Sequence, residues 1–237
     1  KSQQMEKNTK VKARVKAHAL REIINNKDKV YIMGHKIGDM DALGAAVGIF
    51  RAAMHLGKKA YIVINDVTTS VKPIMDRLLT LPEYESVFIN STTAEDTVDS
   101  SSVVVVVDVN KPSYTECENL LSMCRTLVVI DHHRQSDETI EGAILSYVEP
   151  NASSASEMVA ELLQYIDNGI KLKAAEAEAM YAGVLIDTQN FNNKAGVRTF
   201  EASAFLRRNG ADIIRVRKSL RSDMNEYKAK AATISNM

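Results

Sequence analysis

The chain has 237 residues, of which 45% are hydrophobic and 25% are charged, and its formal net charge at pH 7 is zero. This length and composition are typical of a globular protein with one large α/β domain, with or without helical extensions. The balanced charge gives no reason to expect a long nucleic acid or a membrane surface as a direct partner. No apolar run approaches the roughly 20 residues that a membrane-spanning helix needs.

The first 28 residues are rich in lysine and arginine and predict a helix. Apolar residues recur there at helical spacing, namely Val11, Val15, Ala19 and Ile23, before Asn25-Asn26 interrupts the pattern. A basic helix with a narrow apolar stripe fits either a nucleic-acid-binding arm or a connector that leads from an upstream domain. We favour the connector for residues 1–28. The first residue is not methionine, and we expect the chain to be part of a longer protein.

From residue 29 onward, short apolar runs alternate with helical patterns. The expected strands are 30–33, 59–64, 86–89, 103–107, 127–130 and an edge strand at 143–148. The expected helices are 41–56, 71–79, 113–123, one that Ser153 or Ser154 caps and that ends at Ile166, 173–186 and 199–208, while 91–102 is a polar loop or a short helix. Short β-branched runs between polar residues are typical of strands buried on both faces. The alternation predicts an α/β domain at 29–212, with a doubly wound, mainly parallel sheet flanked by helices.

Small residues in the helix 41–56 indicate that it packs closely on the sheet. The charged segment 213–237 predicts a helical extension, or a linker toward a substrate-binding domain that the chain lacks. The two cysteines, Cys117 and Cys124, do not have the repeated paired spacing of a zinc site. We expect them to be reduced thiols of a cytosolic protein.

Acids and histidines follow three of the expected strands and end one of the expected helices. They are His35, Asp39 and Asp41 after the first strand, Asp108 after the fourth, Asp131, His132 and His133 after the fifth, and Asp187 at the end of the helix 173–186. The carboxyl ends of parallel strands line the ligand crevice of such a sheet, so we expect these side chains to meet there. A single aspartate after a strand is more often a helix cap, and either Asp39 or Asp41 could cap the helix from Ala42. The joint pattern favours a functional site.

The expected site holds five aspartates and three histidines. So many carboxylates cannot stay ionised in one cleft without cations that offset their repulsion. Two divalent metal ions fit this number of ligands. Oxygen-rich ligation with some imidazole suits manganese or another hard to borderline ion better than a structural zinc, which favours thiolates.

These segments also resemble the four motifs of the DHH phosphoesterase superfamily, which is named for a triplet like Asp131-His132-His133. The other three motifs are 35–44, Asp108 and 182–190, and the resemblance runs from about residue 28 to 212. Within the superfamily, the residues of segment 33–44 and of the basic segment 14–17 are most similar to those of the GdpP (YybT) type of cyclic di-AMP phosphodiesterase. Segments 153–157 and 196–202 resemble the same group. Nothing after Asp212 resembles the smaller DHH-associated domain that the family carries.

The resemblance implies a role for each candidate residue. Six would be metal ligands, with His35 and Asp39 at one manganese ion, Asp41, His132 and Asp187 at the other, and Asp108 as a bridge between both. His133 would face the substrate phosphate, so the implied catalytic residues are His133 and Asp108. Asp131 would orient the neighbouring histidines, as carboxylates commonly do for ligating imidazoles.

The resemblance further implies manganese-dependent hydrolysis of cyclic di-AMP to the linear dinucleotide 5′-pApA, by a water that two metal ions activate. One alternative is a related DHH hydrolase that acts on short oligonucleotides, adenosine bisphosphate or pyrophosphate. Another is an inactive nucleotide-binding module. The implied parent protein is bacterial and membrane-anchored, with this part in the cytoplasm and without direct membrane contact. A homodimer is possible.

Overall fold

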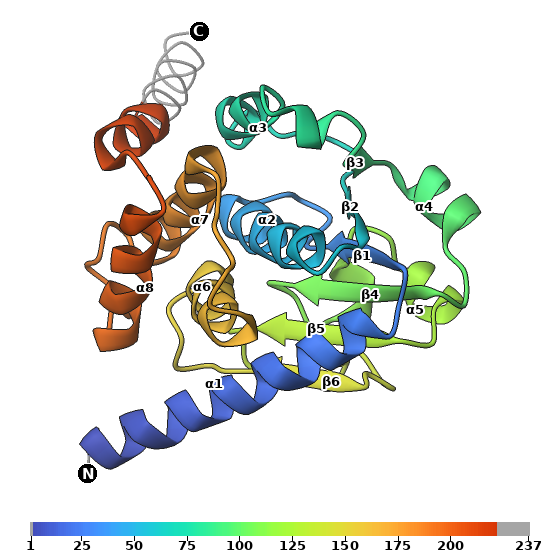
Figure 1. The fold of residues 1–237 in the computed structure, drawn as a ribbon, viewed down its shortest axis with the longest axis horizontal. Helices are drawn as coiled ribbons and strands as arrows, with labels where there is room; N and C mark the ends of the chain where they lie inside the picture. Colours follow the sequence, from blue (N-terminus) through green and yellow to red (C-terminus); the bar gives the residue numbers. More distant parts are fainter. Residues whose placement is uncertain (1, 222–237) are drawn as a thin grey trace, which may run out of the picture.

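The centre of the molecule is a sheet of six strands with helices on both faces (Figure 1). The computed structural model describes residues 2–221. In chain order the strands are β1 (Lys29–Met33), β2 (Lys59–Val63), β3 (Phe88–Ile89), β4 (Ser102–Val107), β5 (Leu127–Asp131) and β6 (Leu145–Val148). Every pairing between them is parallel. The prediction of a doubly wound, mainly parallel α/β sheet is therefore confirmed.

The order of the strands across the sheet is β3-β2-β1-β4-β5-β6. The chain therefore moves outward from β1 to β3, returns to the other side of β1, and continues outward to β6. In open α/β sheets, ligands bind outside the carboxyl ends of the strands at such a reversal. The register pairs Met33 with Val106 and Val107 with Ile130. The segments that follow β1, β4 and β5 consequently leave the sheet at the same edge.

The helices form two layers. In chain order they are α1 (Ser2–Asn25), α2 (Met40–His55), α3 (Lys72–Leu78), α4 (Ser91–Thr97), α5 (Leu120–Met123), α6 (Ala155–Ile166), α7 (Ala174–Asp187) and α8 (Val197–Arg208). Residues 213–221 are also helical, in agreement with the predicted extension, whose remaining residues lie outside the described part. The larger hydrophobic core joins one face of the sheet to α2, α6 and α7. The smaller core joins the opposite face to α4 and α5.

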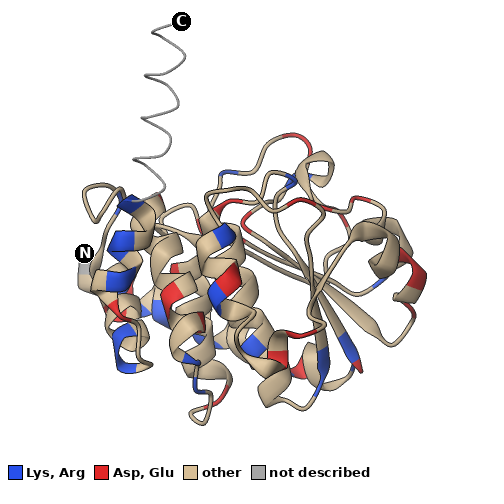
Figure 2. Cartoon of the chain, turned by 90° about the horizontal axis from the view of Figure 1, so that it is seen from above, with Lys and Arg blue, Asp and Glu red and all other residues tan. Residues whose placement is uncertain are grey.

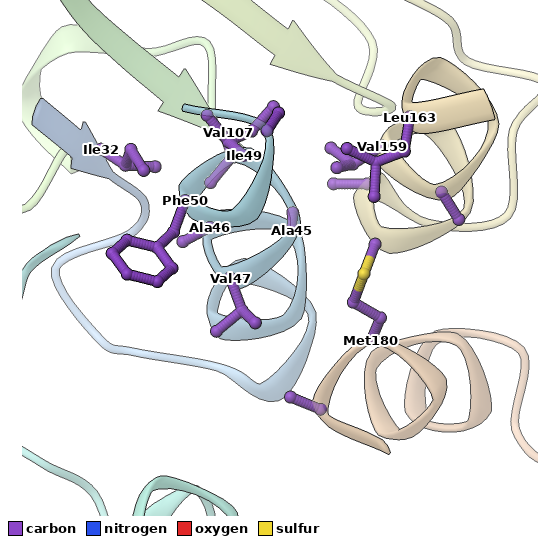
Figure 3. Packing of buried hydrophobic residues seen from close by; sticks show 14 of the residues in the cluster. Ile32, Ala45, Ala46, Val47, Ile49, Phe50, Val107, Val159, Leu163 and Met180 are labelled. Carbon is purple, nitrogen blue, oxygen red and sulfur yellow. The ribbon is translucent and has the colours of Figure 1, made fainter. Parts of the chain in front are cut away.

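Helix α2 is buried along nearly its whole length because it lies between the sheet and two other helices. Figure 3 shows α2 between side chains of the sheet on one side and side chains of α6 and α7 on the other. A Cβ atom on Gly44 would lie 2.6 Å from Oγ of Ser156, and one on Gly48 would lie 2.6 Å from Cγ1 of Val159. These glycines permit contact with α6 and α7, so the prediction that the small residues serve packing on the sheet was wrong for both of them.

The predicted N-terminal helix is present as α1, and Ala19 and Ile23 of the predicted stripe pack against the larger core, whereas Val11 and Val15 do not. Val11 and Val15 are 58% and 60% exposed, whereas Ala13, Ala17 and Leu20 are fully buried. Around the middle of the helix the buried side chains, Ala13 and Ala17, are small, so α1 can lie close to α6 there, and Val11 and Val15 face outward. Sequence spacing could not distinguish the two stripes, because both have helical periodicity.

Several basic residues of α1 are paired with the rest of the fold. Nζ of Lys10 lies 3.2 Å from a carboxylate oxygen of Glu201, and Nζ of Lys12 lies 3.4 Å from one of Glu149. Figure 2 shows basic and acidic residues interspersed along the helices and loops. These pairings favour the structural interpretation of α1 over a nucleic-acid-binding arm.

The predicted helix at 113–123 was wrong. The chain forms a 3₁₀ turn at Pro112–Tyr114 and a separate short helix, α5. Between them, Thr115 pairs with His35 in an isolated antiparallel bridge, which requires extended backbone where the predicted helix would continue. This bridge ties the loop after β4 to the loop after β1.

Both cysteines, Cys117 and Cys124, are buried free thiols. Among the described residues, no helix combines the length and the apolar character that crossing a lipid bilayer requires.

Candidate metal centre

Asp108 is the first residue after β4, and its backbone conformation is unusual. Its φ angle is 64°, in the left-handed region that residues other than glycine rarely adopt. Its backbone N–H donates to the carbonyl of Ile130 at 3.0 Å, so the residue is held against β5. Backbone strain of this kind costs on the order of 1–3 kcal/mol and clusters at functional sites. The position therefore marks the end of β4 as a functional candidate independently of its side chain.

Three other predicted ligands converge beside Asp108. One ligand atom from each of Asp41, Asp108, His132 and Asp187 lies within 4.8 Å of the others. Nε2 of His132 is 3.1 Å from Oδ1 of Asp108, 3.1 Å from Oδ2 of Asp187 and 3.5 Å from Oδ2 of Asp41. These are the residues that were predicted to hold the second metal ion, together with the predicted bridge.

Burial makes this arrangement electrostatically unfavourable for the carboxylates alone. Burial, followed by the charge of Asp187, raises the pKa of Asp41 from 3.8 to about 7. Burial, followed by the charges of Asp41 and Asp39, raises the pKa of Asp108 well above its ordinary value. A cation among these groups would remove the repulsion and favour the ionised forms.

The donor set fits a divalent metal ion. Oδ2 of Asp108 is buried and has no hydrogen-bond partner, so it can serve as a ligand. Three carboxylates and one imidazole suit manganese or a similar ion. The thiols of Cys117 and Cys124 pack in the smaller core on the opposite face of the sheet from α2, and neither belongs to this group of ligands.

Two backbone amides at the start of α6 hold Asp41 in place. The N–H of Ala155 donates to Oδ2 of Asp41 at 2.9 Å, and the N–H of Ser156 donates to Oδ1 at 2.8 Å. The N-terminus of a helix favours an anion, because its first amides are unpaired and its dipole is positive there. Helix α7 also packs closely against Asp41, since a Cβ atom on Gly183 would lie 3.0 Å from Cα of Asp41.

Asp131 organises the second part of the site. It is fully buried, and its Oδ1 accepts the backbone N–H of His132 at 2.8 Å and lies 2.7 Å from Nδ1 of His133. This hydrogen bond is the main cause of the raised pKa of His133. The His133 side chain is 53% exposed, so its ring can meet a ligand. These contacts place Asp131 where it can orient both histidines, and its orienting role stays a prediction.

Asn110 was missed in the sequence. Its Nδ2 donates to Oδ2 of Asp131 at 2.7 Å, and it is also 3.3 Å from the carbonyl oxygen of His133. The available signal was its position two residues after Asp108 on the same predicted loop. Asn110 therefore helps to hold Asp131 in the orientation that serves His133.

His35 and Asp39 lie at the margin of the cluster. Asp39 caps α2, since its Oδ1 accepts the N–H of Ala42 at 2.7 Å, and it is close enough to Asp108 to raise the pKa of that group. The ring centroid of His35 lies 5.7 Å from that of Tyr114. Neither residue belongs to a group of converging ligand atoms in the described part of the chain. Their assignment to the first metal ion stays a prediction.

Known proteins share both the sequence pattern and the fold. The family model described as "DHH family, N-terminal domain" matches residues 29–184. The chain is 40% identical over 238 residues to the cyclic-di-AMP phosphodiesterase GdpP of Bacillus subtilis, a match that covers 100% of this chain and 36% of that protein.

Two crystal structures have a similar fold. An exopolyphosphatase-related protein from Bacteroides fragilis has a TM-score of 0.74 at 19% identity, and the match covers 87% of this chain and 60% of that one. The exonuclease RecJ bound to manganese has a TM-score of 0.50 at 14% identity, with 94% of this chain and 67% of that one covered.

Proposed function

Because this chain belongs to the DHH family, we propose that it hydrolyses a phosphodiester bond of cyclic di-AMP and releases the linear dinucleotide 5′-pApA. One observation carries the proposal: Asp41, Asp108, His132 and Asp187 converge at the carboxyl edge of the sheet. The chain that assembles them is 40% identical over its full length to a cyclic-di-AMP phosphodiesterase. The chain spans 36% of the length of that relative, so the activity of the whole protein is part of the proposal.

We assign the first divalent ion to His35, Asp39 and the shared Asp108, and the second to Asp41, Asp108, His132 and Asp187. Manganese is the proposed metal, which the oxygen-rich ligands favour and which a protein of similar fold, RecJ, binds in its crystal structure. When bound, such ions acidify water and offset negative charge on phosphate oxygens.

The protein's own groups would orient the substrate. His133 is half-exposed, and its contact with Asp131 raises its pKa. The ring can therefore present a cationic N–H to a non-bridging oxygen of the reacting phosphate. Preorganised donors of this kind stabilise charge that develops in the transition state. Asn110 and Asp131 keep the ring in one orientation, so little reorganisation is needed when phosphate arrives.

The proposed placement in the cell follows from the resemblance. Residues 29–212 would be the catalytic domain of a longer, membrane-anchored protein and would lie in the cytoplasm. The match to only 36% of the relative's length supports a longer parent. Further substrate contacts would come from a domain after residue 237.

A hydrolysis assay with purified chain tests the proposal. Cyclic di-AMP, 5′-pApA, adenosine bisphosphate and pyrophosphate are supplied separately, with manganese or with EDTA. We expect manganese-dependent conversion of cyclic di-AMP to 5′-pApA, with lower catalytic efficiency on the other three substrates. Exposed Asp96 in α4 offers a matched control, since Asp96→Asn also neutralises a carboxylate but does so away from the site. Hydrolysis of pyrophosphate or adenosine bisphosphate without any cleavage of cyclic di-AMP would contradict the proposal.

A further inference from the structure

A pocket of about 310 Å³ adjoins the metal centre, and the function proposed above gives no role to Lys111, Tyr114 and Arg134 in its lining. We call it the side pocket. Its lining includes His35, Asn110, Lys111, Tyr114, His133 and Arg134. His133 belongs to both the pocket and the candidate site, so a ligand in the pocket would lie next to the reacting phosphate. Ligand pockets begin at about 300 Å³, so there is room for about one nucleotide.

Tyr114 is held at this pocket with half of its surface open. It is 49% exposed, whereas Tyr31, Tyr84 and Tyr147 are almost completely buried. Its backbone is fixed, because the N–H of Lys36 donates to its carbonyl oxygen at 2.8 Å and the next residue pairs with the loop after β1. An aromatic ring on a fixed backbone, with an open surface, is suited to stacking on a nucleobase.

Lys111 partly covers the ring but can be displaced from it. Its Nζ lies 4.5 Å from the centroid of the Tyr114 ring and 3.7 Å from a carboxylate oxygen of Glu138. An exposed cation–π contact stabilises by about 0.5–1 kcal/mol, and an exposed ion pair by about 0–1 kcal/mol. A base stacked on an aromatic ring stabilises by about 1–3 kcal/mol. A base can therefore take the place of the ammonium group and leave Lys111 free to contact a phosphate.

The charges at the pocket favour an anionic ligand. The side chains of Lys111 and Arg134, both cationic, line it together with the ring of His133. The buried carboxylate of Asp131 is already hydrogen-bonded to Asn110, to His133 and to the backbone. Glu138 is exposed, with 66% of its side chain accessible, so water screens its charge.

From these observations we infer that the side pocket holds the second nucleotide of the substrate, the one whose phosphate is not cleaved. Tyr114 stacks on its base, and Lys111 and Arg134 contact its phosphate. The inference rests on the proposed function for the identity of the substrate. Every base has a π-face, so stacking on Tyr114 contributes affinity and leaves the choice of adenine to other contacts.

Binding measurements in EDTA test the side pocket without any hydrolysis. AMP and ribose 5-phosphate, which has no base, are titrated calorimetrically into the chain. We expect Tyr114→Ala to lower the affinity for AMP about 5- to 150-fold, the range that corresponds to a loss of 1–3 kcal/mol of binding free energy. Tyr114→Phe, which keeps the ring, should stay within about two-fold of the wild type, and the affinity for ribose 5-phosphate should change far less than that for AMP. Arg134→Ala should weaken both probes, because both carry a phosphate.

Tyr165 provides the matched control. It lies in α6, at the end remote from Asp41, and it too has a cation over its ring, with Cζ of Arg14 5.4 Å from the centroid. Tyr165→Ala should bind AMP as the wild type does. Thermal unfolding of each variant checks that the fold is intact.

The outcomes test nucleotide binding in the side pocket independently of the proposed function. The inference that the side pocket binds a nucleotide is overturned if Tyr114→Ala binds AMP with unchanged affinity, or if the wild type does not bind AMP at millimolar concentration. Either result counts even if cyclic di-AMP is hydrolysed. Loss of AMP binding in Tyr114→Ala, with retention in Tyr114→Phe, supports the inference even if cyclic di-AMP proves not to be the substrate. If hydrolysis occurs, Tyr114→Ala should raise KM for cyclic di-AMP more than it lowers kcat.

Discussion

Asp41→Asn tests whether the buried carboxylate cluster opposes folding when no metal is bound. The pKa of Asp41 rises from 3.8 to about 7 in the folded protein, which corresponds to roughly 4 kcal/mol at a pH above both values. The unfolded chain binds fewer protons at this group between those values, so stability falls as the pH rises from about 4 to about 7. Asparagine is neutral throughout and removes this dependence.

The substitution also has a cost. Asp41 accepts two backbone N–H groups, from Ala155 and Ser156, and asparagine offers only one acceptor oxygen. One buried N–H would then be unpaired, which costs about 1–3 kcal/mol. In EDTA at pH 8 we therefore expect Asp41→Asn to be more stable than the wild type by about 1–3 kcal/mol. At pH 5 Asp41 is protonated in the folded protein but ionised in the unfolded chain, so the penalty falls to about 1.6 kcal/mol, similar to the cost of the unpaired N–H, and most of this advantage should disappear.

Urea unfolding at pH 5 and pH 8, in EDTA and in manganese, measures these differences. Manganese at one hundred times its dissociation constant should stabilise the wild type by about 2.7 kcal/mol and should stabilise the variant much less. The control Asp96→Asn should follow the wild type under all four conditions. A stability difference between Asp41→Asn and the wild type that is the same at both pH values in EDTA would refute the electrostatic explanation.

Three further predictions concern neighbouring groups. Asp108→Ala should abolish hydrolysis of cyclic di-AMP, because the carboxylate assigned to both ions is lost; retention of more than a few per cent of activity at saturating manganese would contradict this. His132→Ala should lower the metal content after dialysis, whereas His133→Ala should keep it and slow hydrolysis instead; equal metal loss in both would exclude the two separate roles. Gly183→Ala should lower Tm by about 2–12 °C, because a Cβ atom there would lie 2.5 Å from a buried oxygen of α6 and overpacking costs about 1–3 kcal/mol. Gly196→Ala, whose Cβ atom would have no neighbour within 4 Å, should change Tm far less in the same thermal scan.

The sequence predicted the sheet and the place of the site for a simple physical reason. A strand buried on both faces is a run of β-branched residues, and its end is visible where Asp108 interrupts the valines. Parallel pairing then brings the ends of β1, β4 and β5 to one edge without any knowledge of the loops. The strand ends predicted only that the candidate residues would share this edge, whereas the separate grouping of Asp41, Asp108, His132 and Asp187, which the structure brings together, came from the resemblance to the DHH superfamily.

The roles of Asp39 and Asp41 could not be separated in the same way. Both stand at the start of α2 at plausible capping positions, and sequence reasoning left open which of them caps the helix. In the structure Asp39 caps the helix. The carboxylate of Asp41 instead accepts hydrogen bonds from the backbone amides of Ala155 and Ser156, which are 114 and 115 positions away in the chain. A contact over that separation depends on the packing of α2 against α6, and local pattern contains no information about it.

The same limit explains Tyr114 and the broken helix. Residues 113–123 have acceptable helical spacing, but Thr115 is held extended by its bridge to His35. The local 3₁₀ turn places Tyr114 beside Lys111, and the long-range pairing holds this turn next to His35 and the candidate site.

A comparison of electrostatic energies at the metal centre indicates why the helix dipoles alone do not offset the charge of its carboxylates. Asp39 and Asp41 lie at the N-termini of α2 and α6, where a helix dipole stabilises an anion by about 0.3–1 kcal/mol, and up to about 2 kcal/mol when partly buried. Asp187 is the last residue of α7, where the dipole has the opposite sign and opposes a negative charge. The favourable contributions are smaller than the roughly 4 kcal/mol that corresponds to the raised pKa of Asp41 alone. The backbone therefore orients these side chains without offsetting their charge, which leaves that role to a bound cation.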